Sequence, residues 1–179
     1  MIYLLVGLCS CSYMERMYPI KSEKTFRLDD SEVTFIANPE IRIDNQYFKT
    51  IRVGFNGYIG GTNSQKDYRI LPILLMNYDL GSDGGLVHYT EKFNRKYRDD
   101  VIDKIFDFFQ IRLTNPNILL ITWDNMKPKN MSKCYQQQAA NDFESILVWQ
   151  EEKSFIISQY RQVKAPLDCT SHKYGLVST

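Results

Sequence analysis

The stretch of this sequence that most suggests chemistry is a short acidic segment that ends near a histidine. Asp79 and Asp83 alternate with glycines, and His88 follows them. Carboxylates and backbone carbonyls on such a turn could hold calcium, and His88 with either aspartate could transfer protons. An EF-hand loop starting at Asp79, however, needs side-chain ligands where Gly81 and Thr90 stand. A plain turn is therefore the alternative interpretation.

Other catalytic or cofactor patterns are missing from the sequence. The chain has two histidines, His88 and His172, which leaves few candidates for a histidine-based catalytic or metal site. The glycines at Gly57, Gly60 and Gly61 are not followed by the Lys and Ser or Thr of a phosphate-binding loop. We therefore expect no cofactor, and we expect a protein that is not an enzyme.

Composition and charge restrict the class of protein further. The chain has 179 residues, 44% of them hydrophobic, which suits one globular domain with a single core. Twenty-two basic residues oppose twenty-one acidic ones, for a formal net charge of +1. No overall positive field attracts a phosphate backbone, so we do not expect nucleic acid as a partner.

The first dozen residues carry a possible export signal. The apolar run Ile2 to Leu8 is shorter than the roughly 20 residues that cross a bilayer, but it has the length of a signal-peptide core. The sequence Leu8-Cys9-Ser10-Cys11 that ends it resembles the lipobox of bacterial lipoproteins, and no family is recognised for the domain that follows. This resemblance implies that acyl chains on Cys11 anchor the chain in a membrane.

The same resemblance implies a division of the chain. Residues 1–10 are a signal-like segment, residues 11–24 a polar tether, and residues 25–179 a single globular domain. The expected location is the cell envelope, at the outer membrane facing the periplasm. In the alternative interpretation, Ile2 to Leu8 is an edge or core strand and both nearby cysteines are buried thiols.

Two further cysteines, Cys134 and Cys169, lie far from the first pair. In an oxidising compartment they can form one disulfide bond, which would hold the C-terminal tail against the domain. Two unpaired thiols are the alternative, because the sequence does not give their separation in space.

The pattern of elements predicts an α+β fold, mainly an antiparallel β-sheet or sandwich. Short segments rich in β-branched and aromatic residues are typical of strands, while the glycine-rich residues 56–64 indicate a flexible loop. Apolar residues recur every fourth position over residues 91–113 and predict one strong amphipathic helix, which Thr90 can cap. A second, short helix is predicted over residues 131–141.

We expect this domain to act by binding a protein partner in the envelope. Tyrosine places a large amphipathic surface at binding sites for little loss of entropy, and the chain has twelve. An immunity protein against an envelope-acting toxin and an accessory part of an assembly or secretion machine both fit. The alternative is an envelope hydrolase, or a small-ligand or calcium binder, that uses the segment from Asp79 to His88. The tyrosines in or beside predicted loops are Tyr58, Tyr68, Tyr78 and Tyr89.

Overall fold

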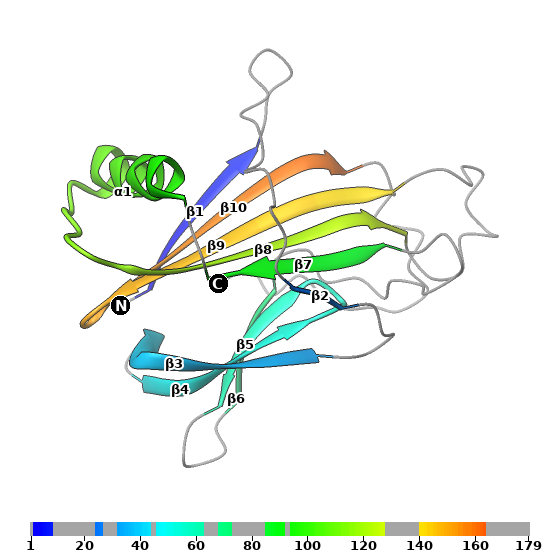
Figure 1. Cartoon of the computed structure of the whole chain (residues 1–179), viewed down its shortest axis with the longest axis horizontal. Coiled ribbons are helices and arrows are strands. Elements are labelled where there is room, and N and C mark those ends of the chain that lie inside the picture. The colour runs from blue at the N-terminus through cyan, green and yellow to red at the C-terminus, as the bar shows by residue number, and fades with distance from the viewer. Residues whose placement is uncertain are drawn as a thin grey trace.

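The computed structural model describes residues 2–8, 24–26, 32–43, 46–62, 68–72, 85–91, 94–127 and 140–163. Within them, two β-sheets lie face to face, and one helix lies on the outer side of the larger sheet (Figure 1). The predicted α+β, sandwich-like fold is therefore confirmed.

The larger sheet has six strands in the order β1-β10-β9-β8-β7-β2, and every pair except β1 with β10 is antiparallel. The strands are β1 (Ile2–Leu8), β2 (Lys24–Phe26), β7 (Leu86–Thr90), β8 (Asn117–Met126), β9 (Asn141–Gln150) and β10 (Lys153–Val163).

The smaller sheet has four antiparallel strands in sequence order. They are β3 (Glu32–Ile43), β4 (Gln46–Gly54), β5 (Tyr58–Thr62) and β6 (Tyr68–Pro72). Strand β5 corrects the expectation of a flexible loop over residues 56–64, because only a tight turn with Gly57 at φ 80° separates it from β4.

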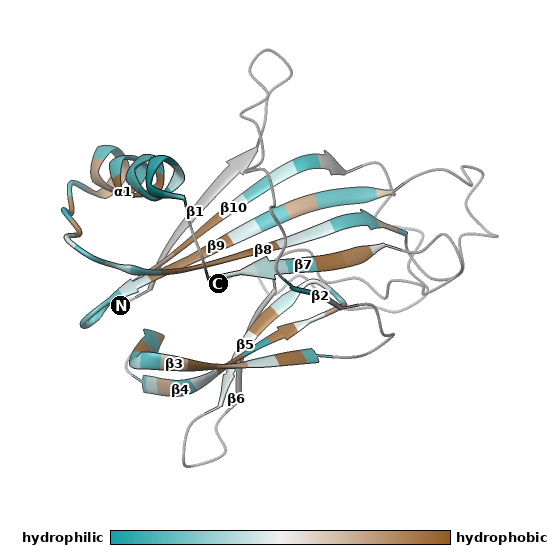
Figure 2. Cartoon of the chain, viewed as in Figure 1, coloured by the Kyte–Doolittle hydropathy of each residue, from teal (hydrophilic) through white to brown (hydrophobic). Residues whose placement is uncertain are grey.

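Strands β8 and β9 are apolar on both faces because both faces are covered. In β8, Leu119, Ile121 and Trp123 point toward the smaller sheet and form the two-sheet core with residues such as Phe48 and Val53. The alternate residues of these strands form a second, helix-side core. Its members are Val101, Ile105, Leu113, Ile118, Leu120, Ile146, Val148, Phe155 and Ile157. Figure 2 shows the apolar stretches of β8 to β10 at the strand ends nearest α1.

The helix is shorter than predicted: α1 runs from Arg95 to Phe109. Its cap is Asn94, whose side chain accepts a hydrogen bond from the backbone N–H of Lys96. Thr90, the predicted cap, is instead the last residue of β7. The helix ends at Gln110, which adopts the left-handed conformation.

Two other predicted segments have different outcomes. The predicted second helix lies largely outside the described residues, although its last residue, Asn141, begins β9. The apolar run from Ile2 to Leu8 is strand β1, which pairs in parallel with β10. A strand at this position is what the alternative interpretation of the N-terminus expected.

Two tryptophans of the larger sheet hold the smaller sheet by hydrogen bonds. The indole N–H of Trp123 donates to the carbonyl of Gly54 over 3.0 Å, and that of Trp149 donates to the carbonyl of Pro39 over 2.9 Å. The ring of Trp123 also stacks on Phe143. Buried indole groups need such partners, so these bonds fix how the sheets sit on each other.

Candidate functional site

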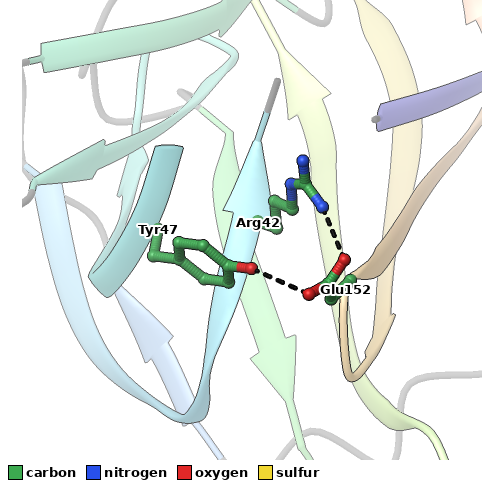
Figure 3. A network of polar contacts seen from close by, with 3 residues as sticks. All are labelled: Arg42, Tyr47 and Glu152. Carbon is green, nitrogen blue, oxygen red and sulfur yellow. Dashed lines mark hydrogen bonds and ion pairs between the residues drawn. The ribbon is translucent and has the colours of Figure 1, made fainter. Parts of the chain in front are cut away.

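Three polar side chains meet where the two sheets come together at one end of the sandwich. Arg42 in β3 and Tyr47 in β4 are directly opposite each other in the ladder, and Glu152 lies in the turn between β9 and β10. Figure 3 shows both side chains directed at the Glu152 carboxylate. We call these three residues the exposed corner.

The geometry of the exposed corner gives each carboxylate oxygen its own donor. Arg42 Nη1 lies 2.8 Å from Glu152 Oε2, while Tyr47 Oη donates to Glu152 Oε1 over 3.4 Å. The Arg42 guanidinium also lies 5.8 Å from the centre of the Tyr47 ring, within the range of a cation–π contact. The three side chains therefore hold one another in place.

The exposed corner is open to solvent although its backbone is firmly held. Tyr47 is 44% exposed, which makes it one of three large hydrophobic residues exposed in the described part of the chain, with Ile36 and Phe108. Behind it, the Trp149 bond to Pro39 joins the two sheets. Tyr47 was not among the tyrosines selected from the sequence, since its contact with Glu152 spans 105 residues.

The tyrosines predicted to contact a partner have different locations. Tyr58 lies on the outer face of the smaller sheet, where its hydroxyl donates to Glu32 over 3.0 Å. Tyr89 packs against the two-sheet core, with its ring edge-on to Phe35. Tyr68 is the first residue of β6, and Tyr78 lies outside the described residues.

The predicted Asp79, Asp83 and His88 group is only partly described. Both aspartates lie outside the described residues. His88 lies in β7, with Nε2 3.9 Å from Oδ2 of Asp124 in the adjacent strand β8. Its Nδ1 atom is buried and has no hydrogen-bond partner among the residues that the structure describes. Asp124 is thus a charged neighbour of His88 that the sequence did not reveal.

His88 also begins a row of polar side chains across the larger sheet. Thr122, Glu144 and Gln159 follow it at opposed positions on β8, β9 and β10. The row shares a face with the helix-side core. Glu144 is completely buried, and one of its oxygens accepts a hydrogen bond from the Thr122 hydroxyl over 3.1 Å. This bond accounts for part of the hydrogen bonding that a buried carboxylate requires.

Comparison with known proteins adds an identification of the domain. A model of the nidogen-like domain family matches residues 39–174, which is more than two thirds of the chain. The chain belongs to the nidogen-like domain family. The interpretation that its domain belongs to no recognised family, and that the only resemblance is to bacterial lipoproteins, is therefore wrong. Searches of curated proteins and of solved structures find no significant match.

The family assignment bears on location. Nidogen-like domains are extracellular, which agrees with an extracellular or envelope location for this chain. In the part of the chain that the structure describes, no helix is both long and apolar enough to span a membrane.

The predictions about cysteines in this nidogen-like domain concern residues that the structure does not describe. Cys11, Cys134 and Cys169 all lie outside the described residues, so lipid attachment and the disulfide bond stay predictions. Across the described ranges, no three His, Cys, Asp or Glu side chains are grouped so that they could hold a metal ion.

Proposed function

We propose that this nidogen-like domain works outside the cytoplasm by binding another protein, without catalysis, and that the exposed corner is its contact surface. The observation that carries the proposal is the arrangement of an exposed Tyr47 and a partly buried Arg42 around Glu152. Tyrosine and arginine are among the residues most enriched where protein interfaces concentrate their binding energy.

The rigidity of the exposed corner supports this role. A side chain that is already held in one conformation loses less entropy when a partner covers it. Arg42 and Tyr47 are held by Glu152 and come from opposed positions in a β-ladder, so most of this ordering precedes binding. The carboxylate and guanidinium also offer an acceptor and donors at the rim of the tyrosine ring.

The test uses quantitative capture followed by affinity measurement. Immobilised full chain, Tyr47→Ala and Phe108→Ala are exposed to extracellular proteins of the source organism, and a captured protein is then purified and titrated. Phe108 is the matched control because it is also an exposed aromatic residue, 63% exposed, but lies on α1. We expect Tyr47→Ala to weaken binding by about 30-fold or more, as truncation of a dominant interface residue does.

Two outcomes would contradict the proposal. One is a partner that binds Tyr47→Ala as tightly as the unchanged chain. The other is a partner whose affinity falls as much with Phe108→Ala as with Tyr47→Ala. Arg42→Ala should weaken the same partner, because Tyr47 then loses its cationic neighbour and Glu152 its charge partner.

Attachment to a membrane is a separate and finer prediction. A lipid on Cys11 would require cleavage before that residue, and cleavage would remove strand β1 from the edge of β10. The intact mass of the protein from its natural source distinguishes the two cases. A lipid-modified chain that begins at Cys11 supports the anchor, whereas a chain that still contains residues 2–8 without lipid contradicts it.

A further inference from the structure

A tyrosine ring lies across the outer face of the smaller sheet. Glu32, Gly54 and Tyr58 occupy one row on β3, β4 and β5, so their side chains share a face. This face is the outer one, because the alternate neighbours Val53 and Ile59 are buried in the two-sheet core.

The hydroxyl of Tyr58 fixes the direction of its ring. It donates to Glu32 Oε2 over 3.0 Å, although Glu32 stands two strands away. Neighbouring strands are about 4.8 Å apart, so a tyrosine side chain can cover this distance only by lying along the sheet. One ring face therefore rests on the sheet, and the Tyr58 side chain is partly exposed to solvent.

Gly54 is what allows the ring to lie so close. A Cβ atom at this position would overlap Cε1 and Cζ of Tyr58. Any other residue at this position would push the ring away from the sheet. The glycine and the Tyr58 hydroxyl bond together make a flat aromatic surface of fixed orientation.

An ion pair, which carries no net charge, borders this surface. Glu32 Oε1 lies 2.6 Å from Arg52 Nη1, and both side chains are partly exposed, at 29% and 34%. On the same face, Arg52 lies between two small residues, Thr34 opposite it on β3 and Gly60 opposite it on β5, while Pro72 of β6 stands opposite Tyr58. The rim thus offers both hydrogen-bond donors and acceptors, and the Glu32–Arg52 pair carries no net charge.

We infer that this tyrosine platform, formed by Tyr58 over Gly54 with Glu32 and Arg52 at its rim, binds a neutral carbohydrate. One face of a pyranose ring is made of C–H groups, which pack on an aromatic ring, while its hydroxyl groups point outward at the edge. Glu32 can accept and Arg52 can donate hydrogen bonds to such hydroxyls. A charged ligand would leave one member of the Glu32–Arg52 pair facing a like charge.

The test is saturation-transfer NMR of the full chain with the methyl glycosides of glucose, galactose, mannose and N-acetylglucosamine, each at millimolar concentration. We expect transfer from the protein to the C–H protons of at least one glycoside. Tyr58→Ala should abolish this signal, while Tyr58→Phe, which keeps the ring but loses its bond to Glu32, should weaken it several-fold.

Control variants separate this site from the exposed corner and from loss of folding. Tyr47→Ala should bind the glycoside as the unchanged chain does, so a failure at this site and a failure of the protein-binding proposal are distinguishable. If Tyr58→Ala does not fold, Tyr58→Leu fills the space above Gly54 without an aromatic ring and should also lose binding. Far-ultraviolet circular dichroism verifies the fold of each variant.

Three results would overturn the inference. The first is no transfer to any of the four glycosides. The second is equal transfer in the unchanged chain and in a folded Tyr58 variant without the aromatic ring. The third is binding of tetramethylammonium without binding of a glycoside, since that would identify Tyr58 as a cation–π surface instead.

Discussion

The two sheets of the sandwich share one core but differ on their outer faces. Part of the outer face of the six-stranded sheet is covered by α1, and the polar row on that face includes the completely buried Glu144. The outer face of the four-stranded sheet carries Ile36, 73% exposed, and the partly exposed Glu32 and Arg52 (Figure 1). The larger sheet is thus buried on both faces in its centre, whereas the two proposed binding surfaces lie mainly on the smaller sheet, with Glu152 contributed by the β9–β10 turn of the larger one.

The largest expected effect tests the stabilising role of the larger sheet. Trp123→Ala removes a fully buried ring, its stack on Phe143 and its bond to Gly54. Large-to-small changes of this kind cost about 3–5 kcal/mol in the free energy of unfolding. Urea unfolding measures the loss, and the same measurement on Tyr47→Ala should give a much smaller value. Equal losses of stability in Trp123→Ala and Tyr47→Ala would contradict this difference between the two sheets.

A second prediction concerns the outer face of the smaller sheet. Gly54→Ala places a Cβ inside the Tyr58 ring, and such overpacking costs about 1–3 kcal/mol. In a chain that already carries Tyr58→Ala, the same Cβ no longer meets the ring, so the cost should fall. A double-mutant cycle by urea unfolding measures this coupling. Additive effects would mean that the Tyr58 ring does not lie over Gly54.

A third prediction separates recognition from stability at the exposed corner. Glu152 is 71% exposed on its side chain, and exposed ion pairs contribute roughly 0–1 kcal/mol. Glu152→Ala should therefore change the free energy of unfolding by less than about 1 kcal/mol, with a smaller change at high salt. The partner affinity should nevertheless fall, because Arg42 and Tyr47 lose the group that orients them. A large loss of stability without loss of affinity would assign the exposed corner to the scaffold.

The smallest effect appears only at alkaline pH. Burial raises the pKa of the Tyr160 hydroxyl above its usual value of 10.0, because the charged phenolate is poorly solvated there. At lower pH, Tyr160 keeps its proton in both the folded and the unfolded chain, so its titration does not change the free energy of unfolding. Above that usual value the unfolded chain loses the proton first, so the free energy of unfolding falls as pH rises.

The variant Tyr160→Phe isolates this contribution. Urea unfolding at about pH 8, 10 and 11 should show a shallower decline for the variant than for the unchanged chain. The other eleven tyrosines titrate in both proteins, so the difference between the two curves belongs to Tyr160. Parallel curves would show that its hydroxyl is as well solvated in the folded chain as in the unfolded one.

Sequence patterns predicted regular elements better than their ends. Apolar residues spaced by four indicated the helix, and Val101 and Ile105 are indeed buried in α1. The same pattern ran on to Leu113, which packs in the helix-side core from the segment after the helix. Residues before and after the end of the helix are both buried and therefore both apolar. The pattern alone therefore does not show that the helix ends at Gln110.

Strand β5 shows why a local pattern can mislead. Its glycines favoured a loop, but in the sheet Gly60 and Gly61 pair with Arg52 and Ile51. Gly61 lies against the ring of Phe48, where a Cβ would not fit without movement. The small size of this residue therefore serves close packing, and a glycine in a sequence indicates close packing and flexibility equally.

The sequence by itself determined the class of fold, because the alternation of apolar residues depends only on which face of each element is buried. Tertiary structure alone brought Glu152 to Arg42 and Tyr47, and laid Tyr58 over Gly54 toward Glu32. These contacts join strands distant in the chain or depend on the register between strands. A one-residue change of register would move every such side chain to the other face, and no local pattern of residues records that choice.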